Sequence, residues 1–100
     1  MGNWGGYVGG LKVLLSKQAA KALDTVPEHV AWKLFAWKEG VEIFGLEEMR
    51  KRPGFHDEPL KGERKGQRSI RLSKAYRAIY RIVRETVVFV LVEEVSKHEY

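Results

Sequence analysis

The spacing of apolar residues changes from a helical period to a strand period along this chain, and this change limits the folds available to it. Between residues 30 and 44 the apolar positions lie three or four apart, at Val30, Leu34, Trp37, Val41 and Phe44. Such spacing predicts the buried face of an amphipathic helix. From Gln67 onward apolar and polar residues alternate, which is typical of strands buried on one face. The chain is therefore expected to be an α+β domain.

A strand and two helices are expected before the sheet. Residues 11–15 form a short apolar run, and Ser16 is a good N-cap for a helix over residues 17–24. The four residues from Thr25 to Glu28 fit a capping box, with proline in the first turn of a second helix. Gly45 is a suitable end for that helix. The two helices would form an antiparallel hairpin whose aromatic stripe packs in the core.

Three antiparallel strands are expected in the second half of the chain. Residues 46–66 read as a connector, with at most one helical turn near its start. The strands begin at Gln67, Tyr76 and Val87, and the turn between the last two falls at residues 84–86. The predicted order is β-α-α-β-β-β, with the N-terminal strand and the helical hairpin packed on a C-terminal antiparallel sheet.

Composition restricts the domain organisation and the environment. One hundred residues suffice for one domain. Residues 1–10 hold five glycines and no charge, so we expect a flexible arm there and a single domain over residues 11–100. The absence of cysteine excludes disulfides and thiolate metal sites. The longest apolar run, Val87–Val92, is too short for a membrane helix, and no secretion signal is evident, so the expected location is cytoplasmic.

Positive charge is concentrated in one part of the sequence. Between Lys61 and Arg84 there are nine Lys or Arg residues and one acidic residue, whereas the whole chain carries a net charge of +5. This asymmetry favours a polyanion or an acidic protein as partner, although a solvated basic surface would give the same pattern. The candidates for contacts with RNA phosphates are Lys61, Arg64, Lys65, Arg68, Lys74 and Arg81.

A second set of residues has the chemistry needed to cleave RNA without a metal ion. Arg71 and Arg77 lie on polar positions of neighbouring predicted strands, and the chain ends in Lys97, His98 and Tyr100. Guanidinium groups match phosphate oxygens, histidine transfers protons near neutral pH, and tyrosine stacks on bases. An RNA-binding protein without activity can show the same residue types. His56 has no second histidine at a workable spacing, so a metal site is not expected there.

Four segments of this chain resemble the RelE/HigB superfamily of toxins from toxin-antitoxin systems. The resemblance covers about residues 58–100 and lies in Pro59-Leu60-Lys61-Gly62, in the Gly-Gln-Arg-Ser-Ile-Arg-Leu run of residues 66–72, in Tyr76-Arg77-Ala78-Ile79-Tyr80 and in Lys97-His98-Glu99-Tyr100. It implies a RelE-like fold. The Tyr-Arg-x-x-Tyr core is shared with ParE-type relatives, which inhibit DNA gyrase and cleave no nucleic acid.

The resemblance also implies an activity and roles for individual residues. Arg77 matches the family arginine that holds the scissile phosphate, and Arg71 matches a basic residue on the preceding strand. His98 and Tyr100 resemble a C-terminal His and Tyr pair, and Lys97 is a possible replacement for a basic residue there. The implied function is an mRNA interferase that acts on the ribosome, needs no metal or small-molecule cofactor, and is neutralised by a cognate antitoxin. The alternatives are a ParE-like gyrase inhibitor and an inactive RNA-binding module.

Overall fold

The computed structural model describes residues 12–84 and 88–97. The predicted glycine-rich arm and most of the predicted turn at residues 84–86 lie outside the described residues. The elements, in chain order, are β1 (Lys12–Leu15), α1 (Lys17–Leu23), α2 (Glu28–Phe44), α3 (Leu46–Arg50), β2 (Glu58–Pro59), β3 (Arg68–Arg71), β4 (Tyr76–Arg84) and β5 (Val88–Lys97), with short 3₁₀ turns at Pro53–Phe55 and Gly62–Arg64. None of the helices in this part of the chain is both long and apolar enough to cross a membrane.

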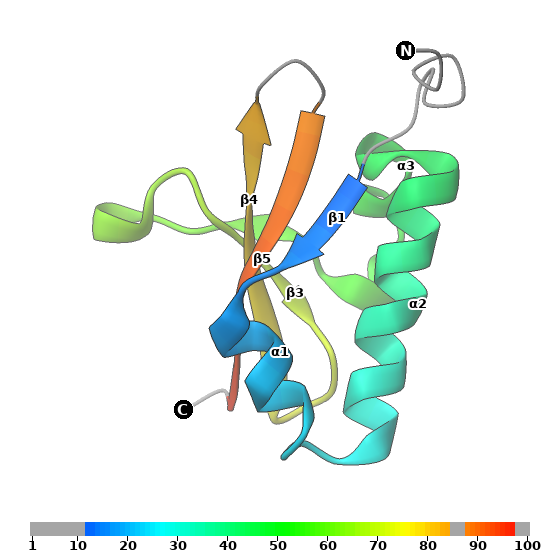
Figure 1. Cartoon of the computed structure of the whole chain (residues 1–100). Helices are drawn as coiled ribbons and strands as arrows, with labels where there is room; N and C mark the ends of the chain where they lie inside the picture. The colour runs from blue at the N-terminus through cyan, green and yellow to red at the C-terminus, as the bar shows by residue number, and fades with distance from the viewer. Residues whose placement is uncertain (1–11, 85–87, 98–100) are drawn as a thin grey trace, which may run out of the picture.

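The strands form one sheet in the order β1-β5-β4-β3-β2, and α2 packs along one face of it (Figure 1). Strands β3, β4 and β5 are antiparallel neighbours, which confirms the predicted C-terminal sheet. Strand β1 joins its edge parallel to β5. The two-residue strand β2 lies in the segment predicted as a connector and pairs with β3 at the opposite edge. The architecture is α+β, as the change of periodicity predicts.

The core lies between α2 and the sheet. Val30, Leu34, Trp37 and Val41 are fully buried, and the Trp37 ring lies 4.9 Å from the ring of Tyr80 on β4, centroid to centroid. The prediction for Phe44 is wrong, because this side chain is 58% exposed. The helix ends there, and the next buried apolar side chains, Leu46 and Met49, come from α3 instead.

The two predicted helix starts have different outcomes. The Ser16 hydroxyl accepts a hydrogen bond from the Ala19 amide at 2.9 Å, which confirms the first N-cap. The predicted capping box is wrong, because α2 begins after Pro27 without any side-chain cap. The Thr25 hydroxyl instead donates to the carbonyl of Ala22 at 2.9 Å and so helps to end α1. A threonine can satisfy either helix end, and the short link between the two helices places it beside the first.

Candidate active site

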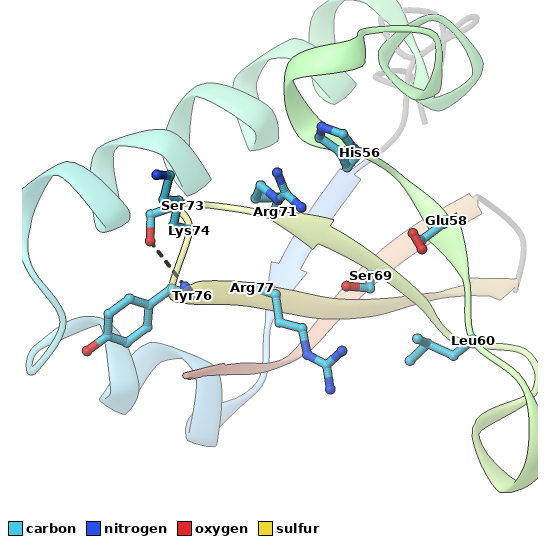
Figure 2. Close-up of a pocket in the computed structure, with 9 residues that line it drawn as sticks. All are labelled: His56, Glu58, Leu60, Ser69, Arg71, Ser73, Lys74, Tyr76 and Arg77. Atoms are coloured by element: carbon cyan, nitrogen blue, oxygen red, sulfur yellow. Dashed lines mark hydrogen bonds between the residues drawn. The ribbon is translucent and has the colours of Figure 1, made fainter. Parts of the chain in front are cut away.

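Two arginines lie side by side on the face of the sheet that points away from the helical core. In the antiparallel pairing of β3 with β4, Arg71 is directly opposite Arg77. Their sequence neighbours Ile70 and Ala78 belong to the buried core, so strand alternation directs both arginines to the other face. Residues directly opposite on neighbouring strands have Cβ atoms about 5 Å apart. Both side chains therefore start from neighbouring positions on this face, and in Figure 2 Arg71 extends toward His56 while Arg77 extends away from it.

These arginines line a pocket of about 170 Å³. Figure 2 shows its lining residues. Three cationic side chains and one carboxylate line it, together with a histidine, and the full set is His56, Glu58, Leu60, Ser69, Arg71, Ser73, Lys74, Tyr76 and Arg77. The lining comes from β3, from β4, from the loop that joins them, and from the segment around β2. Pockets that enclose drug-sized ligands are larger, about 300–1,000 Å³. The size and charge suit a single phosphodiester better than a whole small-molecule substrate.

These two arginines differ from three others nearby, which form ion pairs. Arg64 is paired with Glu94 at 2.7 Å, Arg68 with Asp57 at 2.6 Å, and Arg81 with Glu93 at 3.0 Å. Within residues 12–84 and 88–97, neither of the pocket arginines, Arg71 and Arg77, forms an ion pair or a side-chain hydrogen bond.

The Nε–H group of Arg77 is buried and has no acceptor within the described residues. A buried donor without a partner is costly, and native structures rarely keep one without a reason. An anion in the pocket is a suitable acceptor for an arginine held in this way.

The charge of Arg77 also reaches a carboxylate on β5. A hydrogen bond from Arg64 holds the pKa of Glu94 below its usual value, with further contributions from Ser96 and from the charge of Arg77. Ser96 is directly opposite Arg77 on β5, so Glu94 lies on the diagonal from that arginine. Glu94 forms its ion pair with Arg64 rather than with Arg77, and its charge offsets that of Arg77 only at longer range.

The remaining residues singled out from the sequence are dispersed. Lys61 and Lys65 are exposed beside the 3₁₀ turn that holds Arg64, and Lys97 is exposed at the end of β5. Arg68 points to the helix face rather than to the pocket, because it shares a strand parity with Ile70 and bonds the buried Asp57. His98 and Tyr100 lie outside the described residues, so their predicted roles stay predictions.

The sequence interpretation missed two pocket residues, His56 and Glu58, as proton-transfer candidates. The sequence pattern argues against a metal site at His56 and gives Glu58 no role. Both belong to a connector without periodicity, where His56 adopts a left-handed conformation (φ 45°, ψ 52°). The sequence of this segment carries no periodic signal that would place these side chains beside β3. The described residues include no group of three His, Cys, Asp or Glu side chains that could hold a metal ion.

Comparison with known proteins identifies the fold. No protein-family model matches the chain, and no curated protein sequence matches it. Among solved structures, it is similar to a YoeB/ParE toxin from Agrobacterium tumefaciens, with 16% identity, a TM-score of 0.69, and coverage of 88% of this chain and 99% of that one. It is also similar to YafQ from E. coli, with 17% identity, a TM-score of 0.68, and coverage of 86% and 91%.

A third similar structure comes from an archaeon. The RelE–RelB complex of Pyrococcus horikoshii matches with 23% identity, a TM-score of 0.67, and coverage of 88% of this chain and 94% of that one. The matches cover most of this chain and almost the full length of each of these proteins. The chain therefore has the fold of the RelE, YoeB and YafQ toxins.

Proposed function

We propose that this chain is the toxin of a type II toxin-antitoxin system and that it cleaves mRNA on the ribosome. The observation that carries the proposal is the pair of arginines without ion pairs, Arg71 and Arg77, beside a histidine and a carboxylate in one small pocket. The fold supports it, since the similar structures are toxins of such systems. The neighbouring ion pairs support it as well. Their carboxylates bind Arg64, Arg68 and Arg81, so they form no ion pair with Arg71 or Arg77.

The proposed reaction is transfer of the phosphodiester to the ribose 2′-oxygen. The 2′-oxygen attacks phosphorus while a base takes its proton, and the bond to the 5′-oxygen breaks as an acid supplies a proton to it. The products are a 2′,3′-cyclic phosphate and a 5′-hydroxyl, and no other reactant is needed. Arg71 and Arg77 would bind the non-bridging oxygens and stabilise the added negative charge of the transition state.

Proton transfer requires two further groups near the phosphate. Glu58, as a carboxylate, is the proposed base, and His56, as an imidazolium, is the proposed acid. Both line the pocket with Arg71. Lys97, His98 and Tyr100 remain candidates for the same acid role. So small a set of groups benefits from a partner that positions the RNA, which is the physical reason for proposing cleavage on the ribosome.

The proposed protein partner is a cognate antitoxin. One of the similar structures is a RelE–RelB complex. An antitoxin of this chain would need acidic residues to cover the region between Lys61 and Arg84. We place the activity in the cytoplasm, where mRNA and ribosomes are found.

The test is to express the wild-type chain, Arg77→Ala and Glu58→Gln in a translating extract and to map mRNA 5′ ends. We expect cuts in phase with codons for the wild type, and a loss of at least about 100-fold in both variants. Lys21→Ala, an exposed cation on α1, should cleave like the wild type. Intact mRNA with inhibited supercoiling would instead support a ParE-like toxin. Binding of RNA with neither effect would support an inactive binding module.

A further inference from the structure

A buried carboxylate separates the two proposed proton-transfer residues in the sequence. The side chain of Asp57 is 0% exposed and lies between His56 and Glu58 in the chain. One of its oxygens accepts a hydrogen bond from the Tyr80 hydroxyl at 2.6 Å, and the other accepts one from Arg68 Nε at 2.6 Å. Both donors belong to the sheet, so Asp57 ties this segment to β3 and β4.

The segment alternates between the two sides of the sheet edge. His56, Glu58 and Leu60 line the candidate active site. Pro59 lines a second pocket, of about 260 Å³, together with Asp57's two partners, Arg68 and Tyr80. Successive side chains of an extended strand point to opposite faces, so the side chain of Asp57 is fixed on one side while its two neighbours face the other.

Few other contacts hold this segment in place. Strand β2 has two residues, paired as Glu58 with Ser69 and Pro59 with Arg68, and one further backbone bond joins Leu60 to Gln67 at 2.9 Å. The segment begins at His56 in a left-handed conformation, which is unfavourable for a residue with a Cβ atom. A short edge strand that starts in this way is expected to move unless side chains hold it.

The partners of Asp57 are themselves held firmly. The Tyr80 side chain is fully buried against Trp37 of α2, at 4.9 Å between ring centroids. Arg50 of α3 lies near the Tyr80 hydroxyl as well. The Arg68 guanidinium is three-quarters buried, and its charge is balanced by Asp57. Loss of the carboxylate would leave a largely buried cation without its partner, which is costly, so the contact is expected to persist.

We propose that Asp57 is a positioning residue that sets Glu58 and His56 against the phosphate bound by Arg71 and Arg77. This inference rests on the proposed function. Asp57 touches no substrate, because it lies on the helix side of the sheet edge. Its hydrogen bond to Tyr80, which packs on Trp37, holds the segment that carries the two side chains on the exposed side. A misplacement of about 1 Å at a reacting centre can cost about 100-fold in rate.

The test measures the steady-state kinetics of cleavage of ribosome-bound mRNA by Asp57→Asn and by the matched control Asp24→Asn, an exposed acid at the end of α1. We expect Asp57→Asn to lower kcat by about 10- to 100-fold with KM within about 2-fold, since Arg71 and Arg77 still bind the phosphate. Asp24→Asn should be indistinguishable from wild type. An unchanged kcat for Asp57→Asn, with Arg77→Ala inactive, would overturn the positioning role and leave the proposed function intact.

A double-mutant cycle separates positioning from a general loss of structure. If Asp57 acts through Glu58 and His56, Asp57→Asn should cause less than about 2-fold further loss when His56→Gln and Glu58→Gln are both already present. Equal losses in both backgrounds would show a merely structural role and would overturn the proposal. If Asp57→Asn does not fold, Tyr80→Phe removes one of the two hydrogen bonds and should reduce kcat by several-fold, again only when Glu58 and His56 are present. An active Arg77→Ala would reject the proposed function itself.

Discussion

The salt dependence of RNA binding gives the most direct test of the two pocket arginines. Arg71 and Arg77 lie opposite each other and form no ion pair within the described residues, so each is available for a phosphate. Arg81 is on the same strand as Arg77 but is held by Glu93 at 3.0 Å. Replacement of Arg71 and Arg77 by alanine should therefore weaken binding in a salt-dependent way, and replacement of Arg81 should do so much less.

The expected magnitude follows from counterion release. Each phosphate neutralised on a single strand contributes about 0.7 to the slope of log K against log salt concentration. Two contacts therefore contribute about 1.4. Over a fourfold change in salt, from about 50 to about 200 mM, this part of the slope corresponds to a change of about 7-fold in affinity. The double variant Arg71→Ala/Arg77→Ala should lack that change.

The assay is fluorescence anisotropy with a short RNA whose 2′-hydroxyls are methylated, so that it binds without being cleaved. Each single variant, Arg71→Ala or Arg77→Ala, should lower the slope by about 0.7, and Arg81→Ala by less than half of that. Lys21→Ala serves as a control for the loss of one surface charge. Equal slopes for the wild type and the double variant, or an equal loss for Arg81→Ala, would refute the distinction between paired and unpaired arginines.

Four further predictions concern stability. Leu34→Ala should lower the free energy of unfolding by about 2–5 kcal/mol in urea titrations, because the side chain is fully buried, and a loss below about 1 kcal/mol would contradict this packing. Ser16→Ala should cost about 1 kcal/mol through loss of the N-cap, also measured in urea; no change would argue against the cap. Burial and the hydrogen bond to a carboxylate raise the pKa of Tyr80 above 10, so stability should fall as pH rises above about 10, and Tyr80→Phe should remove this fall. The lowered pKa of Glu94, caused mainly by Arg64, contributes stability that is present above about pH 4.5 and lost at lower pH; thermal midpoints of Glu94→Gln should show a shallower acid dependence.

Most of the fold could be predicted because local patterns agree with the tertiary structure. The helical period of residues 30–41 matches a single buried face. The alternation after Gln67 matches the core face of the strands, which includes Ile70, Ala78 and Tyr80, although Ile79 is buried on the other face. The errors fall where a tertiary contact decides between local alternatives. Phe44 continues the helical spacing, but the chain turns at Gly45 and α3 supplies the next buried side chains. Thr25 satisfies α1 because the link to α2 is short.

The candidate site was predictable only where it lies on β3 and β4, which are joined by a short turn and follow the alternating pattern. Alternation and a hairpin are sufficient to bring Arg71 next to Arg77. The segment around β2 depends instead on a left-handed His56 and on pairing with an edge of the sheet, and neither has a periodic signal. Its position follows from the contacts of Asp57, which are long-range and invisible in the sequence.

The positive charges around the pocket lower the stability of the folded chain, and a bound anion would remove this cost. Like charges directly opposite on neighbouring strands destabilise a sheet, and Arg71 and Arg77 are such a pair. Two carboxylates are near. Glu94 lies diagonally from Arg77 but is bound to Arg64, and Glu58 lines the pocket but forms no ion pair with either arginine within the described residues. Three carboxylates around the sheet edge are each committed to a cation outside the pocket: Asp57, Glu93 and Glu94. Solvation alone does not explain two adjacent guanidinium groups that form no ion pair with any described residue, one of them with a buried Nε–H that has no acceptor in this part of the chain. An incoming phosphate satisfies both groups at once, so the local cost to stability becomes binding free energy for the anion.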